Sequence, residues 1–251
     1  GAVQYDQETP SLTVTMLEDL DCPVDGEISF REAVQYASRY ADLATDGKAR
    51  IAFSPALAAQ AVYGNLQIPV TGGDIALGSQ LTADTLVVAP PEGLRLVFCG
   101  QTNGSARVAA GRLFKLDVGA KLELHDLDVV NFQPVYGSGG ALYLTGNNSV
   151  VASNVCFRGN GVTRFEAGGA IYAGAGSTLK TYGSAFDGNE GGCCGGAVYF
   201  EDSATSTGWA LFERTTFYLN STESALDHEG GTVYAGNGRV VFANTSLIRN
   251  I

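Results

Sequence analysis

The chain lacks long apolar runs and has few of the residues that usually bind metals. Its 251 residues contain no apolar stretch of about 18 residues, so we expect no membrane-spanning segment. Only two histidines occur, His125 and His228, and the five cysteines form no Cys-x-x-Cys pair. A zinc site needs several convergent thiolate and imidazole ligands. We therefore expect neither a metal site nor any other cofactor.

Positive charge is also scarce. There are 15 Lys and Arg residues against 26 Asp and Glu residues, which gives a net charge of −11. A surface of this sign repels phosphates, so we expect no nucleic-acid partner. The acidic residues are scattered along the chain, as suits a soluble protein in an extracellular or cell-surface setting.

Repeated amphipathic helices are missing as well. A helical repeat would show long stretches with apolar residues three and four positions apart, whereas this chain shows short alternating segments such as Ser149–Ala152 and Arg239–Phe242. Glycine, Asn, Asp and Ser separate these segments, and glycine reaches 33 residues, well above the usual ~7%. The pattern is typical of short strands joined by tight turns.

Two interleaved motifs recur with a nearly constant period. Two glycines, a small residue, an aliphatic residue and a tyrosine follow one another in four copies, which start at Gly139, Gly168, Gly195 and Gly230 and so lie 29, 27 and 35 residues apart. The second motif is Phe-x-x-Asn, with a degenerate copy ending at Asn250. Its full copies join Phe157 to Asn160, Phe186 to Asn189 and Phe217 to Asn220.

This period predicts a stacked-repeat fold. One repeat holds a few short strands, and each strand pairs with its counterpart about 4.8 Å away in the next repeat. We therefore predict an all-β, single-stranded parallel β-helix over residues 51–251, right-handed as parallel crossovers usually are. A propeller blade would need ~40 to 50 residues, and a β-sandwich would not repeat one motif at one interval. We also expect the coil to continue beyond Ile251.

The motifs predict which side chains point inward and which point outward. The aliphatic residue before each tyrosine should be buried, the Phe-x-x-Asn phenylalanines should stack inside, and the asparagines should form a hydrogen-bonded ladder. Alternation then places the tyrosines on an outer face. These candidate ligand-binding residues are Tyr143, Tyr172, Tyr199 and Tyr234. A stack of tyrosines suits a glycan or protein partner, and the alternative is a purely structural ladder.

Residues 1–50 should hold a leading strand, a loop and a short helical cap. Ser29 followed by Glu32 forms a capping box, and the apolar spacing predicts a helix over Phe30–Tyr40. An amphipathic helix here would cover the open end of the coil. We assign Arg31 and Glu32 to this cap, with a binding role as the alternative.

These motifs carry a family resemblance. The interleaved Gly-Gly-Ala-Ile/Leu/Val and Phe-x-x-Asn copies over residues 120–251 resemble the repeats of polymorphic outer-membrane proteins, which are surface-exposed β-helical adhesins. The segment Phe30–Val34 resembles the Leu-Arg-Glu-Ala-Ile stretch at the start of many secreted β-helix proteins. The resemblance implies a β-helix that takes part in cell adhesion and virulence.

Other candidate sites are weaker. β-Helix enzymes that cut polysaccharides use clustered acids on one outer face. Asp126 and Asp128 alternate along one strand and should share a face, but Asn154 and Cys156 stand in the next repeat, so no acid recurs there. We therefore assign no catalytic residue. The remaining acidic groups are Glu166 with Asp187 and Glu190, and Asp227 with Glu229 around His228.

The adjacent Cys193 and Cys194 either form a vicinal disulfide or remain two reduced thiols. Three functions stay open at this point. The first is an adhesin or passenger-type β-helix without catalysis that attaches to a host-cell protein or glycan. The second is an extracellular polysaccharide lyase or glycosidase, and the third is a passive structural stalk.

Overall fold

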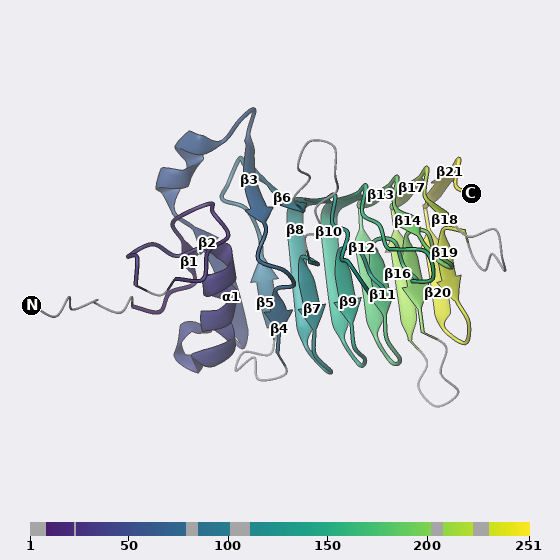
Figure 1. Ribbon diagram of the computed structural model, residues 1–251, viewed down its shortest axis with the longest axis horizontal. Helices are drawn as coiled ribbons and strands as arrows, with labels where there is room; N and C mark the ends of the chain where they lie inside the picture. Colours follow the sequence, from purple (N-terminus) through teal and green to yellow (C-terminus); the bar gives the residue numbers. More distant parts are fainter. Residues whose placement is uncertain (1–8, 23, 79–84, 101–110, 202–207, 223–230) are drawn as a thin grey trace, which may run out of the picture.

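The protein is a parallel β-solenoid, as the period predicted (Figure 1). The computed structural model describes residues 9–22, 24–78, 85–100, 111–201, 208–222 and 231–251. Within these ranges all pairings between named strands are parallel. The helical elements of the described chain are α1 (Phe30–Arg39) and two 3-10 turns, η1 (Ala41–Leu43) and η2 (Pro55–Gln60). Helix α1 and strand β21 (Ser246–Ile248) lie at opposite ends of the coil.

The strands of the described ranges form three sheets. The largest runs in the order β1 (Thr13–Val14), β2 (Lys48–Phe53), β5 (Thr85–Val88), β8 (Lys121–Val130), β10 (Ser149–Arg158), β12 (Thr178–Tyr182), β16 (Trp209–Glu213) and β20 (Arg239–Ala243). Its side branches are β3 (Asn65–Val70), β6 (Arg95–Gly100), β13 (Ala185–Asp187), β17 (Thr216–Tyr218) and β21 (Ser246–Ile248). The second sheet holds β4 (Ala76–Leu77), β7 (Phe114–Leu116), β9 (Leu142–Leu144), β11 (Ile171–Ala173), β15 (Val198–Phe200) and β19 (Val233–Ala235). β14 (Glu190–Gly191) pairs with β18 (Ser221–Thr222).

The largest sheet begins earlier than the expected boundary at residue 51. β2 starts at Lys48, and β1 pairs with it in parallel. The polar stretch before β2 is a tight turn, in which Asp46 and Gly47 adopt positive φ and Thr45 bridges to Lys48. The leading segment therefore contributes the first strand of the solenoid sheet.

A column of left-handed residues bends the strands at one corner of the coil. The φ angle is 53° at Asp126 in β8 and 54° at Asn154 in β10. The register of β8 and β10 places these two residues opposite each other. The later corner positions with positive φ are Gly183, Arg214 and Asn244. Because each bend interrupts the two-residue alternation, the faces on its two sides must be read separately.

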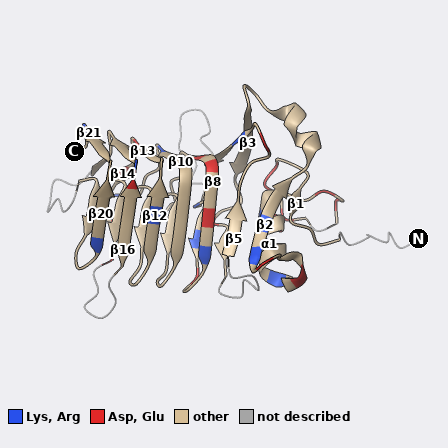
Figure 2. Cartoon of the chain, turned by 180° about the vertical axis from the view of Figure 1, so that it is seen from behind, with Lys and Arg blue, Asp and Glu red and all other residues tan. Residues whose placement is uncertain are grey.

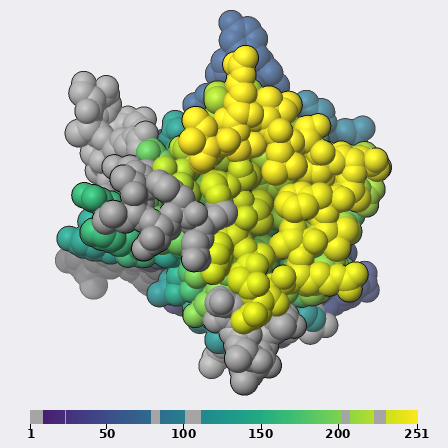
Figure 3. Space-filling model, turned by 90° about the vertical axis from the view of Figure 1, so that its right-hand side faces the viewer, coloured from purple at the N-terminus to yellow at the C-terminus, as the bar shows by residue number. Residues whose placement is uncertain are grey.

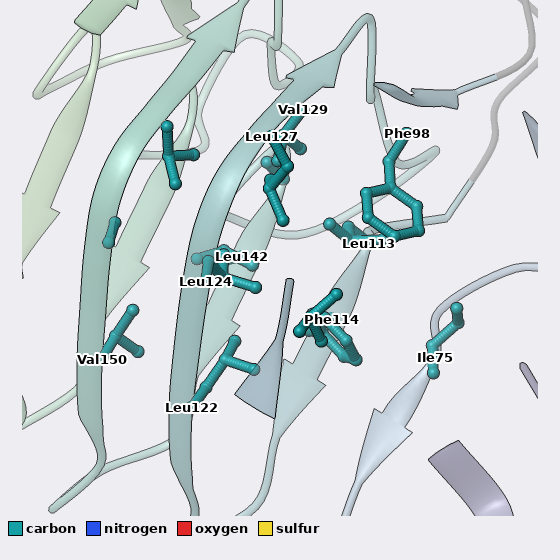
Figure 4. Packing of buried hydrophobic residues seen from close by; sticks show 14 of the residues in the cluster. Ile75, Phe98, Leu113, Phe114, Leu122, Leu124, Leu127, Val129, Leu142 and Val150 are labelled. Atoms are coloured by element: carbon teal, nitrogen blue, oxygen red, sulfur yellow. The ribbon is translucent and has the colours of Figure 1, made fainter. Parts of the chain in front are cut away.

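The core is a continuous stack of apolar side chains (Figure 4). In β8 the residues Leu122, Leu124, Leu127 and Val129 all point inward. Further along the coil, fully buried phenylalanine rings stack with centroids 5.0 Å apart for Phe157 and Phe186 and 4.8 Å apart for Phe186 and Phe217. The aliphatic residues Leu142, Ile171 and Val198 are buried, and Val233 is half-buried.

The glycine pairs are required by backbone geometry. Gly168 has a φ of 70°, a backbone conformation that residues other than glycine rarely adopt. A Cβ atom at Gly169 would lie 2.1 Å from the carbonyl oxygen of Gly196 in the next turn. Successive turns can thus approach closely only because the second position of the motif has no side chain.

Helix α1 covers the N-terminal end of the core. Ser29 and Glu32 form the expected capping box, and Glu32 also accepts a hydrogen bond from the Cys22 amide. The Phe30 ring lies 4.6 Å from that of Phe98. Arg31 is buried and joins α1 to Asp19 through two hydrogen bonds of 2.8 Å. Arg31 and Glu32 therefore both hold the helical cap in place.

The opposite end presents the last turn of the coil (Figure 3). Apolar side chains there are partly exposed, including Phe242 at 45% and Leu247 at 54%. No helix in the described part of the chain is long and apolar enough to span a membrane.

Candidate functional site

Four tyrosines form a ladder along the second sheet. The ring centroids are 5.0 Å apart for Tyr143 and Tyr172, 5.3 Å for Tyr172 and Tyr199, and 4.8 Å for Tyr199 and Tyr234. The ring planes deviate by 14° or less from parallel. Each tyrosine pairs with the next in strand register and is half-buried, so one edge of the stack reaches solvent.

Two cations stand where the ladder begins. Lys115 in β7 pairs in register with Tyr143, so it occupies the ladder position one turn earlier. Its side chain is exposed and forms no ion pair with any described residue. The guanidinium carbon of Arg112 lies 5.3 Å from the centre of the Tyr143 ring, within the range of a cation–π contact.

A pocket of about 340 Å³ opens at this end of the ladder. This volume is in the range of small-ligand sites. The residues lining it are Arg112, Lys115, Tyr136, Gly137, Ser138, Tyr143, Glu166 and Tyr172. The pocket thus combines aromatic walls with an ammonium, a guanidinium and a carboxylate.

Arg112 shapes the pocket wall. Its guanidinium forms an ion pair with Asp74 at 2.9 Å and donates hydrogen bonds to the carbonyls of Tyr136, Ser138 and Gly139. The side chain is buried, so these bonds fix the loop that carries the 82% exposed Tyr136. Arg112 is therefore a positioning residue, and Lys115 is the cation that remains accessible to a ligand.

Glu166 supplies the carboxylate of the pocket. Its Oε2 atom accepts a hydrogen bond of 2.9 Å from the Ser138 hydroxyl. The same hydroxyl accepts a bond from the Ala167 amide, which links the two loops on either side of the opening. A ligand would meet Glu166 as a fixed acceptor.

Two hydroxyls in the middle of the ladder, those of Tyr172 and Tyr199, hold their protons tightly. Burial raises the pKa of Tyr172 well above its ordinary value, and the neighbouring Glu201 carboxylate and the ring hydroxyls raise it further. Burial, followed by the neighbouring Tyr234, raises the pKa of Tyr199 to about 12. Near neutral pH these groups are therefore hydrogen-bonding hydroxyls and not phenolate bases or nucleophiles.

Cys193 and Cys194 lie close to the ladder as two free thiols. Burial raises the pKa of Cys193, and its contact with Cys194 raises it further. A thiol with a raised pKa is a poor nucleophile at neutral pH. The Cys193 amide donates to the carbonyl of Glu166, so this segment supports the pocket through its backbone.

Asp126 and Asp128 are separated by the corner of the coil. Asp126 occupies the left-handed bend and accepts a hydrogen bond from the Asn154 side chain at 2.7 Å. Asp128 follows the bend and forms an ion pair of 2.6 Å with Arg95. The left-handed residue interrupts the alternation on which the expectation of a shared face rested, and the two carboxylates have different partners.

The acidic residues of the next group have separate partners. Asp187 forms an ion pair with Arg158, whereas Glu166 accepts a hydrogen bond from the Ser138 hydroxyl. Glu190 lies in the short strand β14. Asp227, His228 and Glu229 lie outside the described residues. Within the described ranges, no group of three or more His, Cys, Asp or Glu side chains is arranged to hold a metal ion.

Sequence reasoning found the ladder but missed Arg112, Lys115 and Tyr136. A signal for Lys115 existed, since Phe114–Leu116 and Leu142–Leu144 share the pattern of an apolar, a long polar and an apolar residue. Comparisons with protein-family models, with curated proteins and with solved structures found no match. The functional proposal therefore uses the geometry of this chain and its repeat motifs.

Proposed function

We propose that this chain is a non-catalytic attachment module of the adhesin or passenger type that binds a glycan along its tyrosine ladder. The observation that carries the proposal is the stack of half-exposed rings that leads into the pocket at Tyr143. The resemblance of the repeats to polymorphic outer-membrane proteins supports display outside the cell. The partner is a glycan of a host cell, either free or carried by a host protein.

The chemistry of the ladder suits a saccharide. The ring edges form an apolar strip against which the C–H groups of a sugar can pack, and the hydroxyl tips form hydrogen bonds at the same surface. The hydroxyls of Tyr172 and Tyr199 stay protonated near neutral pH because their pKa values are raised. Lys115 and Glu166 add a donor and an acceptor at the end of the strip. A chain lying along the coil would contact several turns at once.

The proposal excludes catalysis at this pocket. Hydrolysis of a glycosidic bond usually requires two carboxylates placed across it. Glu166 is the only carboxylate among the described residues that line the pocket. Burial raises the pKa values of the nearby Cys193 thiol and of the Tyr199 hydroxyl, so neither group acts as a second base at neutral pH.

The test is attachment of a double variant, Tyr172→Ala with Tyr199→Ala, to host cells and to a glycan array. The matched control replaces Tyr182 and Tyr218, two half-buried tyrosines in the largest sheet. Circular dichroism first establishes that both variants keep the fold. Each aromatic contact of this kind is worth roughly 1 kcal/mol, so we expect the ladder variant to lose binding about tenfold or more.

Retention of parental binding by the ladder variant contradicts the assignment of the binding surface. The absence of catalysis has a separate test, which is incubation of the protein with acidic and neutral polysaccharides. Release of reducing ends or unsaturated products overturns that part of the proposal.

A further inference from the structure

A second aromatic site lies on a different face of the coil. Trp209 is the only tryptophan of the chain, and it stands at the start of β16 in the largest sheet. Figure 2 views this sheet and shows basic residues on β12 and β20, the two strands that flank β16. In strand register Trp209 pairs with Thr178 on one side and with Arg239 on the other.

Trp209 lies between two cations. The ammonium nitrogen of Lys180 in β12 is 5.1 Å from the centre of the indole ring. On the β20 side, a pocket of about 420 Å³ is lined by Gly208, Trp209, Arg239 and Val241. Lys180 thus covers one face of the Trp209 indole. On the β20 side, Trp209 lines the pocket together with Arg239.

No acidic side chain in the described part of the chain pairs with these two cations. Neither Lys180 nor Arg239 forms an ion pair with the residues described, although the net charge of the chain is −11. Four other basic residues on the coil are neutralised by acidic partners. Their pairs are Lys48 with Glu123, Arg95 with Asp128, Arg112 with Asp74 and Arg158 with Asp187. The Trp209 face is therefore a local positive site on an acidic protein.

We propose that this pocket binds an anionic saccharide, with a sugar ring against Trp209 and a carboxylate or sulfate on Arg239. A guanidinium binds such planar or multidentate anions through paired hydrogen bonds, and an indole packs against the apolar face of a sugar ring. Val241 adds an apolar wall. Lys180 provides a second cation for the next acidic group along the saccharide.

The spacing of the cations sets the length of the ligand. β12 and β20 are both neighbours of β16, so they lie two strand spacings, or roughly 10 Å, apart. A saccharide with acidic groups on separate rings reaches both. At physiological ionic strength, charges on the protein more than about 8 Å away are largely screened. The local cations therefore determine the sign of the electrostatic potential at the pocket.

The single tryptophan makes the site directly observable. We would titrate the protein with a galacturonic acid trimer, a heparin hexasaccharide and neutral cellohexaose, and follow Trp209 fluorescence at low and high salt. We expect a saturable change with at least one anionic saccharide, weaker binding at high salt, and no comparable change with cellohexaose. The carboxylated and sulfated probes distinguish which anion the site takes. The proposal is overturned if neither binds, or if cellohexaose binds equally well.

Two charge variants test the position of the site. Arg239→Gln should weaken binding about tenfold, the effect of losing one charge-assisted hydrogen bond. The matched control is Lys121→Gln. Lys121 is an exposed cation in β8 that lies in strand register with Trp209 and Arg239, three strands before Trp209 and away from the pocket. It should leave the affinity within about twofold of the parent. Equal losses in the two variants would mean general charge attraction and would refute a built site.

A further variant separates this site from the tyrosine ladder. The Tyr172→Ala, Tyr199→Ala double variant should bind the anionic saccharide at Trp209 as the parent does. Loss of the fluorescence response in this folded variant would assign the binding to the ladder and contradict a second site. Failure at Trp209 leaves the ladder proposal intact.

Discussion

Asn189 donates a hydrogen bond from its side-chain Nδ2 to Oδ1 of Asn220, 2.8 Å away in the next turn of the coil. The same Nδ2 donates to the backbone carbonyl of Phe157 in the preceding turn. Asn220 repeats this arrangement with Asn250 and the carbonyl of Phe186. The two ends of the Phe-x-x-Asn motif therefore interlock between neighbouring turns, which explains why the motif recurs as a unit.

Replacement of Asn189 by Ala should lower the free energy of unfolding by about 3 kcal/mol or more. The side chain is fully buried, and its loss leaves the Asn160 amide and the Phe157 carbonyl without these partners. Each unsatisfied buried group costs about 1 to 3 kcal/mol. Urea unfolding followed by circular dichroism measures the change. The half-exposed Asn250→Ala is the control and should cost less, since water reaches the freed groups.

Replacement of Phe186 by Ala should cost about 3 to 5 kcal/mol, because it opens a cavity in the middle of the ring stack. Phe186 is fully buried and contacts the rings of Phe157 and Phe217. Phe242→Ala is the matched control, since that ring is 45% exposed. Thermal and urea unfolding compare the two variants. Equal destabilisation by both would contradict the central place of the Phe186 stack.

Replacement of Arg31 by Ala should detach helix α1 from the coil and cost about 3 kcal/mol, as loss of one partner of a buried ion pair does. Asp19 retains amide hydrogen bonds from Thr71 and Gly72 but loses its counter-ion. Hydrogen exchange should then increase first in Phe30–Arg39. Arg39→Ala, in the exposed last turn of the same helix, should change stability little. An unchanged exchange pattern in Arg31→Ala would argue against the tether.

Alkaline pH should destabilise the fold through the tyrosine ladder. The pKa of Tyr199 is about 12 in the folded chain, above the unfolded value near 10. Between these pH values the unfolded chain releases the proton while the folded chain keeps it, so stability is complete below about pH 10 and falls as pH rises toward 12. Urea midpoints at stepped pH measure the loss.

Tyr199→Phe tests the assignment, because phenylalanine cannot ionise. Its urea midpoint should fall less steeply with pH than that of the parent. Ultraviolet absorbance should also show fewer late-titrating phenols in this variant. Identical pH profiles for parent and variant would show that Tyr199 does not carry the effect.

The sequence predicted the repeating parts of this protein because equivalent positions in successive turns have the same neighbours and need the same residue types. The regular spacing of Phe157, Phe186 and Phe217 predicted which rings stack on each other. The glycine pairs predicted where successive turns approach closely. The outward direction of Tyr172 followed from the two-residue alternation next to the buried Ile171. These features are local and repeat at one period, so they could be predicted from the spacing of residues in the sequence.

Only the tertiary structure decided the parts that depend on contacts between different turns. The left-handed bend at Asp126 interrupts the alternation between it and Asp128, and no alternation rule predicts such a bend. Arg112 joins Asp74 to the loop of Tyr136, and Trp209 meets Lys180 and Arg239 from the neighbouring strands. These partners lie about 24 to 38 residues apart in sequence and are brought together by stacking in register, at the close strand spacing of a parallel sheet.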